Sequence, residues 1–257
     1  MVAGATPATH RVNRMPPILI AERVNKTFGA VVAAADIDLA IERDSVVSLI
    51  GANGAGKTTF LNMITGYLHP SSGHIRFEGR ELTGLTSRQI TRLGVSRSFQ
   101  IPQVLGSLSV HDNLRVAEDI AGSAHVEQAA QRLLDQFGLT PYAERAAALL
   151  PEGVRKLLDV AMALVAKPRV LLLDEPTSGV AADEKFGIMD RVMNAVRGSG
   201  VTVLFVEHDM DIVSRYAHRV IAFYDGRVIA DGSPESVLAS ESVRRYVIGE
   251  KIEHAAA

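Results

Sequence analysis

The sequence predicts an α/β protein with a mostly parallel sheet, helices on both faces of that sheet and an inserted helical part. The chain begins rich in β-branched runs, has helical spacing over about residues 86–167, and then alternates strands with helices. Such alternation is typical of a parallel sheet covered by helices. The length of 257 residues corresponds to one large domain or two unequal lobes, at about 150 residues per domain.

The β-rich start is predicted from short apolar runs. Weak alternation or β-branched residues mark these runs, and turn residues such as Asn25-Lys26 and Gly51 end them. Strands are expected at Ile18–Val24, Ala30–Ile41, Val46–Ile50 and His74–Glu78. A helix is expected at Thr58–Leu68, where Phe60, Leu61, Ile64 and Leu68 share one face.

The middle and the end of the chain differ in their periodicity. In the middle, helices are expected from Ser87 and at Val110–Ile120, Val126–Phe137, Tyr142–Ala148 and Arg155–Ala166. Towards the end, strands are expected at Val170–Leu173, Val201–Val206, Val220–Tyr224 and Arg227–Ala230, with helices at Asp183–Arg197 and Met210–Ala217. Ser233-Pro234-Glu235 opens a last helix, because it places a capping serine before a proline at the first helical position.

Composition excludes several classes of protein. There are 27 Lys+Arg and 29 Asp+Glu, a balance that argues against non-specific nucleic-acid binding, so we expect no nucleic-acid partner. The lack of cysteine excludes a disulfide scaffold, a thiolate metal site and a cysteine nucleophile. No apolar run reaches the ~18 residues that cross a bilayer. Residues 1–16 carry arginines without an apolar segment, so we expect a flexible N-terminal extension on a cytosolic chain.

The segment Gly51–Thr58 has the pattern G-x-x-x-x-G-K-[ST] of a phosphate-binding loop. It follows a predicted strand and opens a predicted helix, which is the context that this motif requires. Glycines let backbone N–H groups surround phosphates, and the helix presents its positive N-terminus to them. Lys57 would reach the β- and γ-phosphates, and the Thr58 hydroxyl would bind Mg²⁺. The expected nucleotide-binding residues here are Gly51, Asn53, Gly54, Ala55, Gly56, Lys57, Thr58 and Thr59.

Two acidic residues end the apolar run Val170–Leu173. The strand end would place Asp174 beside the phosphate loop, where its carboxylate can hold the Mg²⁺ shell. Glu175 is then available to polarise an attacking water. By itself, a strand that ends in acidic residues is a weak signal, and it gains weight from the phosphate loop upstream.

Two further polar residues stand at transitions in the predicted fold. His208 follows the strand Val201–Val206 and could donate a hydrogen bond to the γ-phosphate or orient the water. Gln100 lies where the β part gives way to the helical part. Taken alone, a histidine in this position is more often a satisfied surface or core residue, and a glutamine such as Gln100 is more often a polar turn residue.

The phosphate loop, Gln100, a turn at 150–154, Asp174-Glu175 and His208 stand in an order that resembles the nucleotide-binding subunit of an ABC transporter. The resemblance covers roughly residues 18–250. It implies a P-loop NTPase core with an N-terminal antiparallel β part and an inserted α-helical subdomain. Its boundaries would be an ATPase domain at 17–250, made of a core at 17–85 and 168–232 with a helical subdomain at about 86–167, and a C-terminal helical tail at 233–257.

The same resemblance implies roles for individual residues. Phe28 would stack on adenine, Gln100 would lie in the loop that senses Mg²⁺ and touches a membrane partner, Glu175 would be the general base and His208 the switch histidine. Thr58, Gln100 and Asp174 would be the Mg²⁺ ligands. Such subunits pair head to tail around two ATP molecules, so Gly153 in the signature turn would cover the nucleotide of a second ATPase subunit.

Finer features are similar to one branch, the ATPases of branched-chain amino-acid importers. They are Arg97–Gln100, Leu108–Leu114, Val206–Met210 and Tyr224–Pro234. The resemblance implies two integral-membrane permease subunits, indirectly an extracytoplasmic solute-binding protein, and a peripheral position on the cytoplasmic face of the inner membrane. The substrate would be a branched-chain amino acid or a related small solute.

Two segments depart from the family pattern. Where the family has a Leu-Ser-Gly-Gly-Gln type turn, this chain has Leu150-Pro151-Glu152-Gly153-Val154, so the serine hydroxyl is missing. Either Gly153 and the helix dipole suffice there, or the chain forms an asymmetric heterodimer with one weak site. Alanines at 181 and 182 also replace the Asp or Asn that the family usually has after the acidic pair.

Two other classes of ATPase or GTPase remain as alternatives. A soluble ABC ATPase acting on nucleic acid, the ribosome or a protein assembly usually has two cassettes, long coiled coils or zinc modules, which this sequence lacks. The other alternative is a plain phosphate-loop kinase or GTPase. A GTPase would normally show an Asn-Lys-x-Asp motif, whereas Asn25-Lys26-Thr27-Phe28 lacks the Asp and precedes the phosphate loop.

Overall fold

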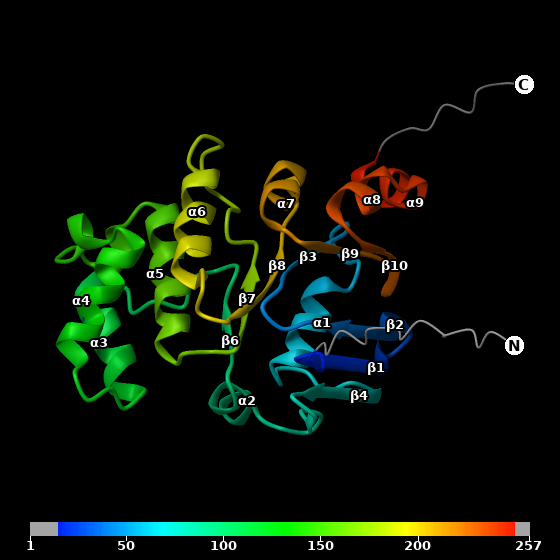
Figure 1. The fold of residues 1–257 in the computed structure, drawn as a ribbon, viewed down its shortest axis with the longest axis horizontal. Coiled ribbons are helices and arrows are strands. Elements are labelled where there is room, and N and C mark those ends of the chain that lie inside the picture. The colour runs from blue at the N-terminus through cyan, green and yellow to red at the C-terminus, as the bar shows by residue number, and fades with distance from the viewer. Residues whose placement is uncertain (1–14, 250–257) are drawn as a thin grey trace, which may run out of the picture.

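The computed structural model describes residues 15–249, so residues 1–14 of the predicted extension and the last residues of the predicted tail lie outside it. Two sheets and a group of helices make up the described part (Figure 1). Within residues 15–249, no helix combines the length and the apolar character needed to cross a membrane.

The central sheet has the order β10-β9-β3-β8-β7-β6 within the described residues. Its parallel strands pair in register through β3, β6, β7, β8 and β9, while β10 is antiparallel to β9 at the edge. The strand bounds are β3 Val46–Ile50, β6 Val95–Ser98, β7 Val170–Asp174, β8 Thr202–Val206, β9 Arg219–Tyr224 and β10 Arg227–Gly232. The predicted, mostly parallel sheet is therefore confirmed.

A second, antiparallel sheet has the order β2-β1-β4-β5. Its strands are β1 Leu19–Phe28, β2 Val31–Ile41, β4 Ser72–Phe77 and β5 Arg80–Glu81. This confirms the expected N-terminal antiparallel part. Helix α1, Lys57–Ile64, lies between the two sheets in the ribbon (Figure 1).

The remaining helices cover the central sheet and form a separate group beside it. In Figure 1, α3, α4 and α5 lie together on one side, and α6 stands between them and the sheet. Their bounds are α2 Ser87–Leu93, α3 Val110–Ile120, α4 Val126–Phe137, α5 Glu152–Val165, α6 Lys185–Val196 and α7 Met210–Tyr216. The C-terminal end carries α8 Pro234–Ala239, α9 Glu241–Val243 and a π-helical turn at Arg244–Ile248. As predicted, Ser233 caps α8 by accepting from the Ser236 backbone N–H.

Three element predictions need correction. The stretch 86–167 is not purely helical, because β6 lies inside it and pairs with β7 in the central sheet. The predicted helix at Tyr142–Ala148 is wrong: two 3₁₀ turns, Thr140–Tyr142 and Ala147–Leu149, stand there instead. Within this segment the backbone makes bonds three residues apart, such as Arg145 N–H to Tyr142 O at 2.9 Å. Its other backbone groups bond to residues 106–111, for example Arg145 O, which accepts from Val110 N–H at 3.0 Å.

The third correction concerns the end of α1, which stops at Ile64 rather than at Leu68. The Thr65 hydroxyl donates to the Leu61 carbonyl at 2.8 Å, and Gly66 follows with φ +72°. A hydroxyl that bonds back to a helical carbonyl, followed by a left-handed glycine, ends a helix.

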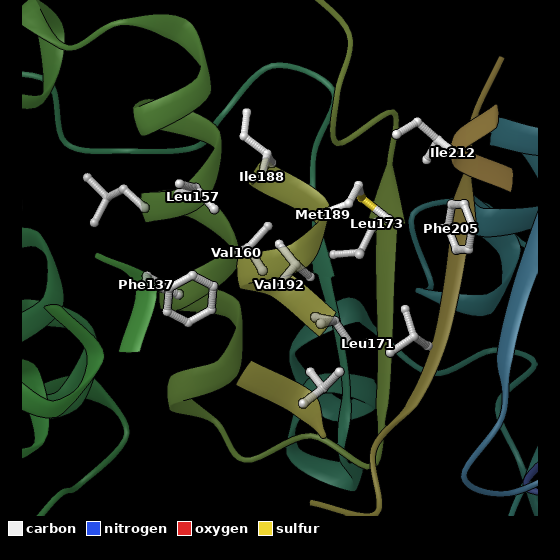
Figure 2. Packing of buried hydrophobic residues seen from close by; sticks show 14 of the residues in the cluster. Phe137, Leu157, Val160, Leu171, Leu173, Ile188, Met189, Val192, Phe205 and Ile212 are labelled. Carbon is white, nitrogen blue, oxygen red and sulfur yellow. The ribbon is translucent and has the colours of Figure 1, made fainter. Parts of the chain in front are cut away.

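The central sheet separates two hydrophobic cores. In β7, Leu171 and Leu173 face one core while Val170 and Leu172 face the other, as the two-residue period of a strand requires. Figure 2 shows the first core, in which α6 inserts Met189 and Val192 between the sheet and the α5 face. The second core fills the space between the central sheet, α1 and the antiparallel sheet.

Candidate nucleotide site

The phosphate loop connects β3 to α1 at the carboxyl end of the central sheet. Gly51 has φ +152°, and an added Cβ would lie 2.5 Å from the Phe223 carbonyl oxygen. Gly56 has φ +105°, and its Cβ would lie 2.6 Å from the Ala33 carbonyl oxygen. Both positions therefore require glycine, and they fix the loop against strands of both sheets.

Lys57 is buried at the start of α1 and bends over the loop. Its Nζ donates to the carbonyl oxygens of Gly51 at 2.7 Å and Ala52 at 3.0 Å. Burial lowers the pKa of Lys57, and the nearby carboxylates of Glu175 and Asp174 act in the opposite direction. The loop therefore holds a positive charge beside its backbone N–H groups, which is the arrangement that an anionic phosphate chain requires.

The other predicted loop residues differ in exposure. Ala55 and Gly56 are buried, Thr59 is half-buried, and Asn53, Gly54 and Thr58 are exposed. Asn53, Gly54 and Thr58 are therefore accessible to a ligand. Their ligand roles stay predictions.

Asp174 ends β7 and forms an ion pair that the sequence did not predict. Its Oδ2 accepts from Arg97 Nη2 at 2.5 Å, and both side chains are almost fully buried. Arg97 also donates to Asn62 Oδ1 at 2.6 Å, and its guanidinium lies 5.0 Å from the centre of the Phe99 ring. The carboxylate that is expected to bind Mg²⁺ is thereby held beside α1 by an arginine from β6.

The structure brings Glu175, Gln100 and His208 together. Glu175 Oε2 accepts from Gln100 Nε2 at 2.9 Å, and Oε1 lies 3.0 Å from His208 Nε2. The three residues belong to segments that follow β7, β6 and β8, whose carboxyl ends share one edge of the sheet. A carboxylate with a polar group on each oxygen, next to the phosphate loop in the fold, is suited to act as a general base.

The backbone at Glu175 is in the left-handed region, with φ +51°. For a residue other than glycine this conformation costs about 1–2 kcal/mol. Hydrogen bonds hold it: its N–H donates to Val206 O at 3.1 Å, and its carbonyl accepts from Ser178 N–H at 3.1 Å. Strain held in place at a carboxylate is a common feature of functional sites.

Two buried charged residues of α5 were missed in the sequence analysis. Lys156 Nζ donates to the carbonyl oxygens of Glu175 and Gln100, at 2.7 and 3.3 Å, and to Ser178 Oγ at 3.2 Å. Asp159 accepts from the backbone N–H groups of Phe99 at 2.9 Å and Gln103 at 2.8 Å. The available signal was a charged residue in the middle of an otherwise apolar helix, where a buried charge requires partners.

Burial sets the pKa values of this pair in opposite senses. Burial lowers the pKa of Lys156, and the carboxylates of Glu152, Glu207, Glu175 and Asp159 raise it. Burial raises the pKa of Asp159, and its two backbone hydrogen bonds, together with Lys156, lower it. Each charge thus lies within a local set of compensating groups, as buried ions must.

Phe28 lies at the tip of the β1–β2 hairpin and is 48% exposed. Lys26 Nζ lies 5.0 Å from the centre of its ring. The hairpin is tied to the phosphate loop through Gly226: the Gly226 N–H donates to Ala55 O at 3.1 Å, and the Ala35 N–H donates to Gly226 O at 2.8 Å. An exposed aromatic ring on a strand fixed to the phosphate loop is compatible with the predicted adenine stacking, which stays a prediction.

Gly153 lies in the first turn of α5, which begins at Glu152 with Pro151 as its N-cap. The Pro151 side chain makes no capping hydrogen bond. Gly153 is buried, and an added Cβ would lie 2.7 Å from Ile188 Cδ1, so close packing against α6 already requires a glycine there. Its predicted contact with a partner's nucleotide is not tested within a single chain.

The donor set that was predicted for Mg²⁺ fits this ion chemically. A hydroxyl, an amide oxygen and a carboxylate are hard oxygen ligands, and Mg²⁺ bound with a nucleotide takes its other ligands from phosphates and water. Within residues 15–249, no group of three or more His, Cys, Asp or Glu side chains forms a metal site. A site that depends on substrate oxygens does not need such a cluster.

Comparison with known proteins gives concordant matches. Residues 34–178 match the family described as ABC transporter. The chain is 33% identical to the high-affinity branched-chain amino acid transport ATP-binding protein BraF of Pseudomonas aeruginosa, over 91% of this chain and 98% of BraF. It is 32% identical to the corresponding protein LivG of Escherichia coli, over the same shares.

Solved structures agree with these matches. The ATP-binding cassette of an ABC transporter in its ADP conformation aligns with a TM-score of 0.82 and 29% identity, over 92% of this chain and 100% of that one. A nucleotide-free ATP-binding cassette from an ABC transporter aligns with a TM-score of 0.79 and 29% identity, over 91% and 100%.

Proposed function

The chain belongs to the ABC transporter family and is one of its ATPases, and we propose that it powers the import of branched-chain amino acids or closely related small solutes. The observation that supports this substrate class is the one-third identity to transport ATP-binding proteins named for branched-chain amino acids, over nearly the full length of both chains. The order of Arg97–Gln100, Asp174-Glu175 and His208, which resembles the importer ATPases, supports the same substrate class.

The proposed chemistry assigns one task to each part of the site. The phosphate loop and Lys57 bind the phosphates, and Phe28 stacks on the adenine. Thr58, Gln100 and Asp174 would hold Mg²⁺, which supplies charge neutralisation on the β- and γ-phosphates. Glu175 accepts the proton of the attacking water.

Gln100 contacts one oxygen of this carboxylate and His208 contacts the other, so together they hold the Glu175 side chain in one orientation. Loss of the γ-phosphate removes contacts of the phosphate loop and of His208 at once. That difference between ATP and ADP is what would let a closed pair of subunits open.

We propose a second ATPase subunit as the immediate partner, paired head to tail. The α5 N-terminus would cover the partner's nucleotide through Gly153. Here it carries Pro151 in place of a hydroxyl donor and the Glu152 carboxylate in its first turn. A carboxylate at this position repels a phosphate. This favours a heterodimer, in which the site completed by this α5 is the weaker of the two.

The proposed contact with the permease subunits is the surface beside the Gln100 loop. A cavity of about 180 Å³ lies there between α2, β6 and the end of α5, lined in part by Tyr67, Phe99 and Met162. Ile101, which follows Gln100, is 76% exposed. The rings of Tyr67 and Phe99 pack edge to face, with 5.7 Å between their centres. An exposed apolar loop next to a recess suits a helix from another subunit. It would place the protein peripherally on the cytoplasmic face of the membrane.

The test is purification of the tagged chain from its own membranes in mild detergent, followed by reconstitution of the complex in liposomes. The proposal expects polytopic permeases and a second ATPase, and ATP-driven uptake of radiolabelled leucine, isoleucine or valine. The solute-binding protein, the indirect partner, is added on the substrate side. Recovery of only soluble, ribosomal or DNA-bound partners would refute the transport role. Uptake of an unrelated solute instead would refute the substrate class alone.

A further inference from the structure

We propose that Lys156 of α5, together with Asp159 one turn later, is a positioning residue for ATP hydrolysis. It joins the segment that carries Glu175 to the loop that carries Gln100, so that the two side chains move as one unit. The proposal rests on the function proposed above for Glu175. It concerns a helix that contributes no side chain to the phosphate loop itself.

The ammonium group of Lys156 is fully used. A lysine has three N–H donors, and here they meet three acceptors: the Glu175 carbonyl at 2.7 Å, the Ser178 hydroxyl at 3.2 Å and the Gln100 carbonyl at 3.3 Å. The side chain is 3% exposed, so water does not replace any of these contacts. One buried cation therefore links α5, the segment after β7 and the loop after β6.

The contact with Glu175 acts on the strained part of the site. The Glu175 carbonyl accepts from Lys156 and from the Ser178 N–H, while its own N–H donates to Val206 O. These bonds define the peptide planes on both sides of a residue at φ +51°. Because the direction of a side chain follows from its backbone, the ammonium helps to set where the Glu175 carboxylate points.

Asp159 completes the connection from the same face of α5. Residues three apart on a helix are neighbours on its surface. The Asp159 carboxylate accepts from the N–H groups of Phe99 and Gln103, on either side of Gln100. Between these two N–H groups, the Gln100 carbonyl accepts a hydrogen bond from Lys156 Nζ. The Gln100 loop is thus held at three backbone points by two side chains of one helix.

This arrangement predicts a specific split in the kinetics. In the described part of the chain, Lys156 has no hydrogen bond to the phosphate loop, whose phosphate contacts would come from Lys57 and backbone N–H groups. Removing the ammonium should leave ATP affinity in place and lower turnover, because a catalytic group displaced by about 1 Å costs roughly 100-fold in rate. A residue that acted only on folding would lower both together.

The central experiment compares Lys156→Met with wild type for kcat of ATP hydrolysis, dissociation constant of ATP and thermal midpoint. Methionine keeps most of the buried stem and removes the charge. We expect kcat to fall by about 10- to 100-fold, with the dissociation constant within twofold. The thermal midpoint should fall, because three buried acceptors lose their donor. Lys156→Arg, which keeps the charge and the donors, should recover part of the loss. Lys167→Met, at an exposed lysine just beyond α5, is the matched control and should behave as wild type.

A second readout does not depend on catalysis. Asp159→Asn leaves one oxygen acceptor in place of two, so backbone amides around Phe99 and Gln103 should exchange hydrogen for deuterium faster than in wild type. Asp119→Asn, at an exposed aspartate of α3, is its control. This exchange measurement, together with the kinetics of Lys156→Arg, tests the link between α5 and the Gln100 loop even when Lys156→Met does not fold.

Wild-type kcat in Lys156→Met, or a parallel loss of ATP affinity and kcat, overturns the positioning role. Unchanged exchange of the Gln100 loop in Asp159→Asn overturns the part assigned to Asp159. Glu175→Gln is measured alongside: if that variant keeps normal turnover, the role proposed for Glu175 itself fails. If Glu175→Gln is inactive while Lys156→Met is normal, only the present inference fails.

Discussion

Replacing Glu175 with glutamine tests the proposed general base without disturbing its neighbours. The carboxylate has one polar partner on each oxygen, Gln100 Nε2 at 2.9 Å and His208 Nε2 at 3.0 Å. A glutamine amide can accept from Gln100 through its oxygen and donate to His208 in the tautomer that carries its proton on Nδ1. Both contacts survive, so the fold and the site geometry should be kept.

The expected effect is then confined to the chemical step. A general base contributes about 10²- to 10⁴-fold in rate, which corresponds to about 2.7–5.4 kcal/mol at 1.36 kcal/mol for each factor of ten. ATP affinity should be no weaker than in wild type. The reason is that Glu175 is a negative charge close enough to raise the pKa of Lys57, and its removal lessens repulsion of the phosphates.

The assay measures phosphate release at saturating ATP, together with ATP binding by displacement of a fluorescent analogue. Glu144→Gln makes the same chemical change at an exposed residue and should keep wild-type values for both. Turnover of Glu175→Gln within threefold of wild type would refute the general-base assignment. Loss of ATP binding in step with turnover would refute the argument that the two hydrogen bonds survive.

Three further predictions concern binding and stability. Lys57→Ala should weaken ATP binding by about 10- to 150-fold, the worth of a charge-assisted hydrogen bond; titration showing unchanged affinity contradicts the role of Lys57. Gly56→Val should destabilise the fold by more than about 1 kcal/mol in urea unfolding, because its Cβ would meet the Ala33 carbonyl at 2.6 Å. The hydrogen bond from Lys185 lowers the pKa of Asp209, so its stabilisation is present above the ordinary aspartate pKa, about 3.9, and is lost as pH falls through the lowered value. Asp209→Asn should therefore unfold more easily than wild type at pH 7, by at most about 1 kcal/mol for a partly exposed pair, and this difference should shrink at pH 3; a constant difference would contradict the ion pair.

Much of the architecture could be predicted from local patterns. Strands such as Val46–Ile50 carry their signal in five consecutive residues, and the phosphate-loop pattern includes its own strand and helix context. Glu175 and His208 both follow predicted parallel strands, whose carboxyl ends share one edge of a sheet, and their contact at 3.0 Å agrees with that expectation. The contact of Gln100 with Glu175 was not predicted, because the strand before Gln100 was not.

The parts that were missed depend on contacts between distant segments. β6 is four residues long and directly follows the helix C-cap Gly94, so it has no visible period of its own. Helical spacing at Tyr142–Ala148 is present, but several of its backbone groups bond to residues 106–111, which no local pattern encodes. Lys156 and Asp159 were missed for the same reason. Their partners lie 19 to 60 positions away in the sequence, and most of these partners are backbone atoms, which no sequence pattern marks.

The place of β3 in the central sheet has a consequence for synthesis of the chain. Among the residues that the structure describes, β3 pairs only with β8 and β9, which lie more than 150 residues later in the sequence. While the chain emerges from the ribosome, residues 46–50 have no strand to pair with until Thr202–Tyr224 has been made. Until then, the phosphate loop is not held in place by the central sheet. A product that stops short of that point contains the whole phosphate-loop sequence and no nucleotide site. ATP can therefore bind only to chains that already contain the Gln100 loop and Glu175.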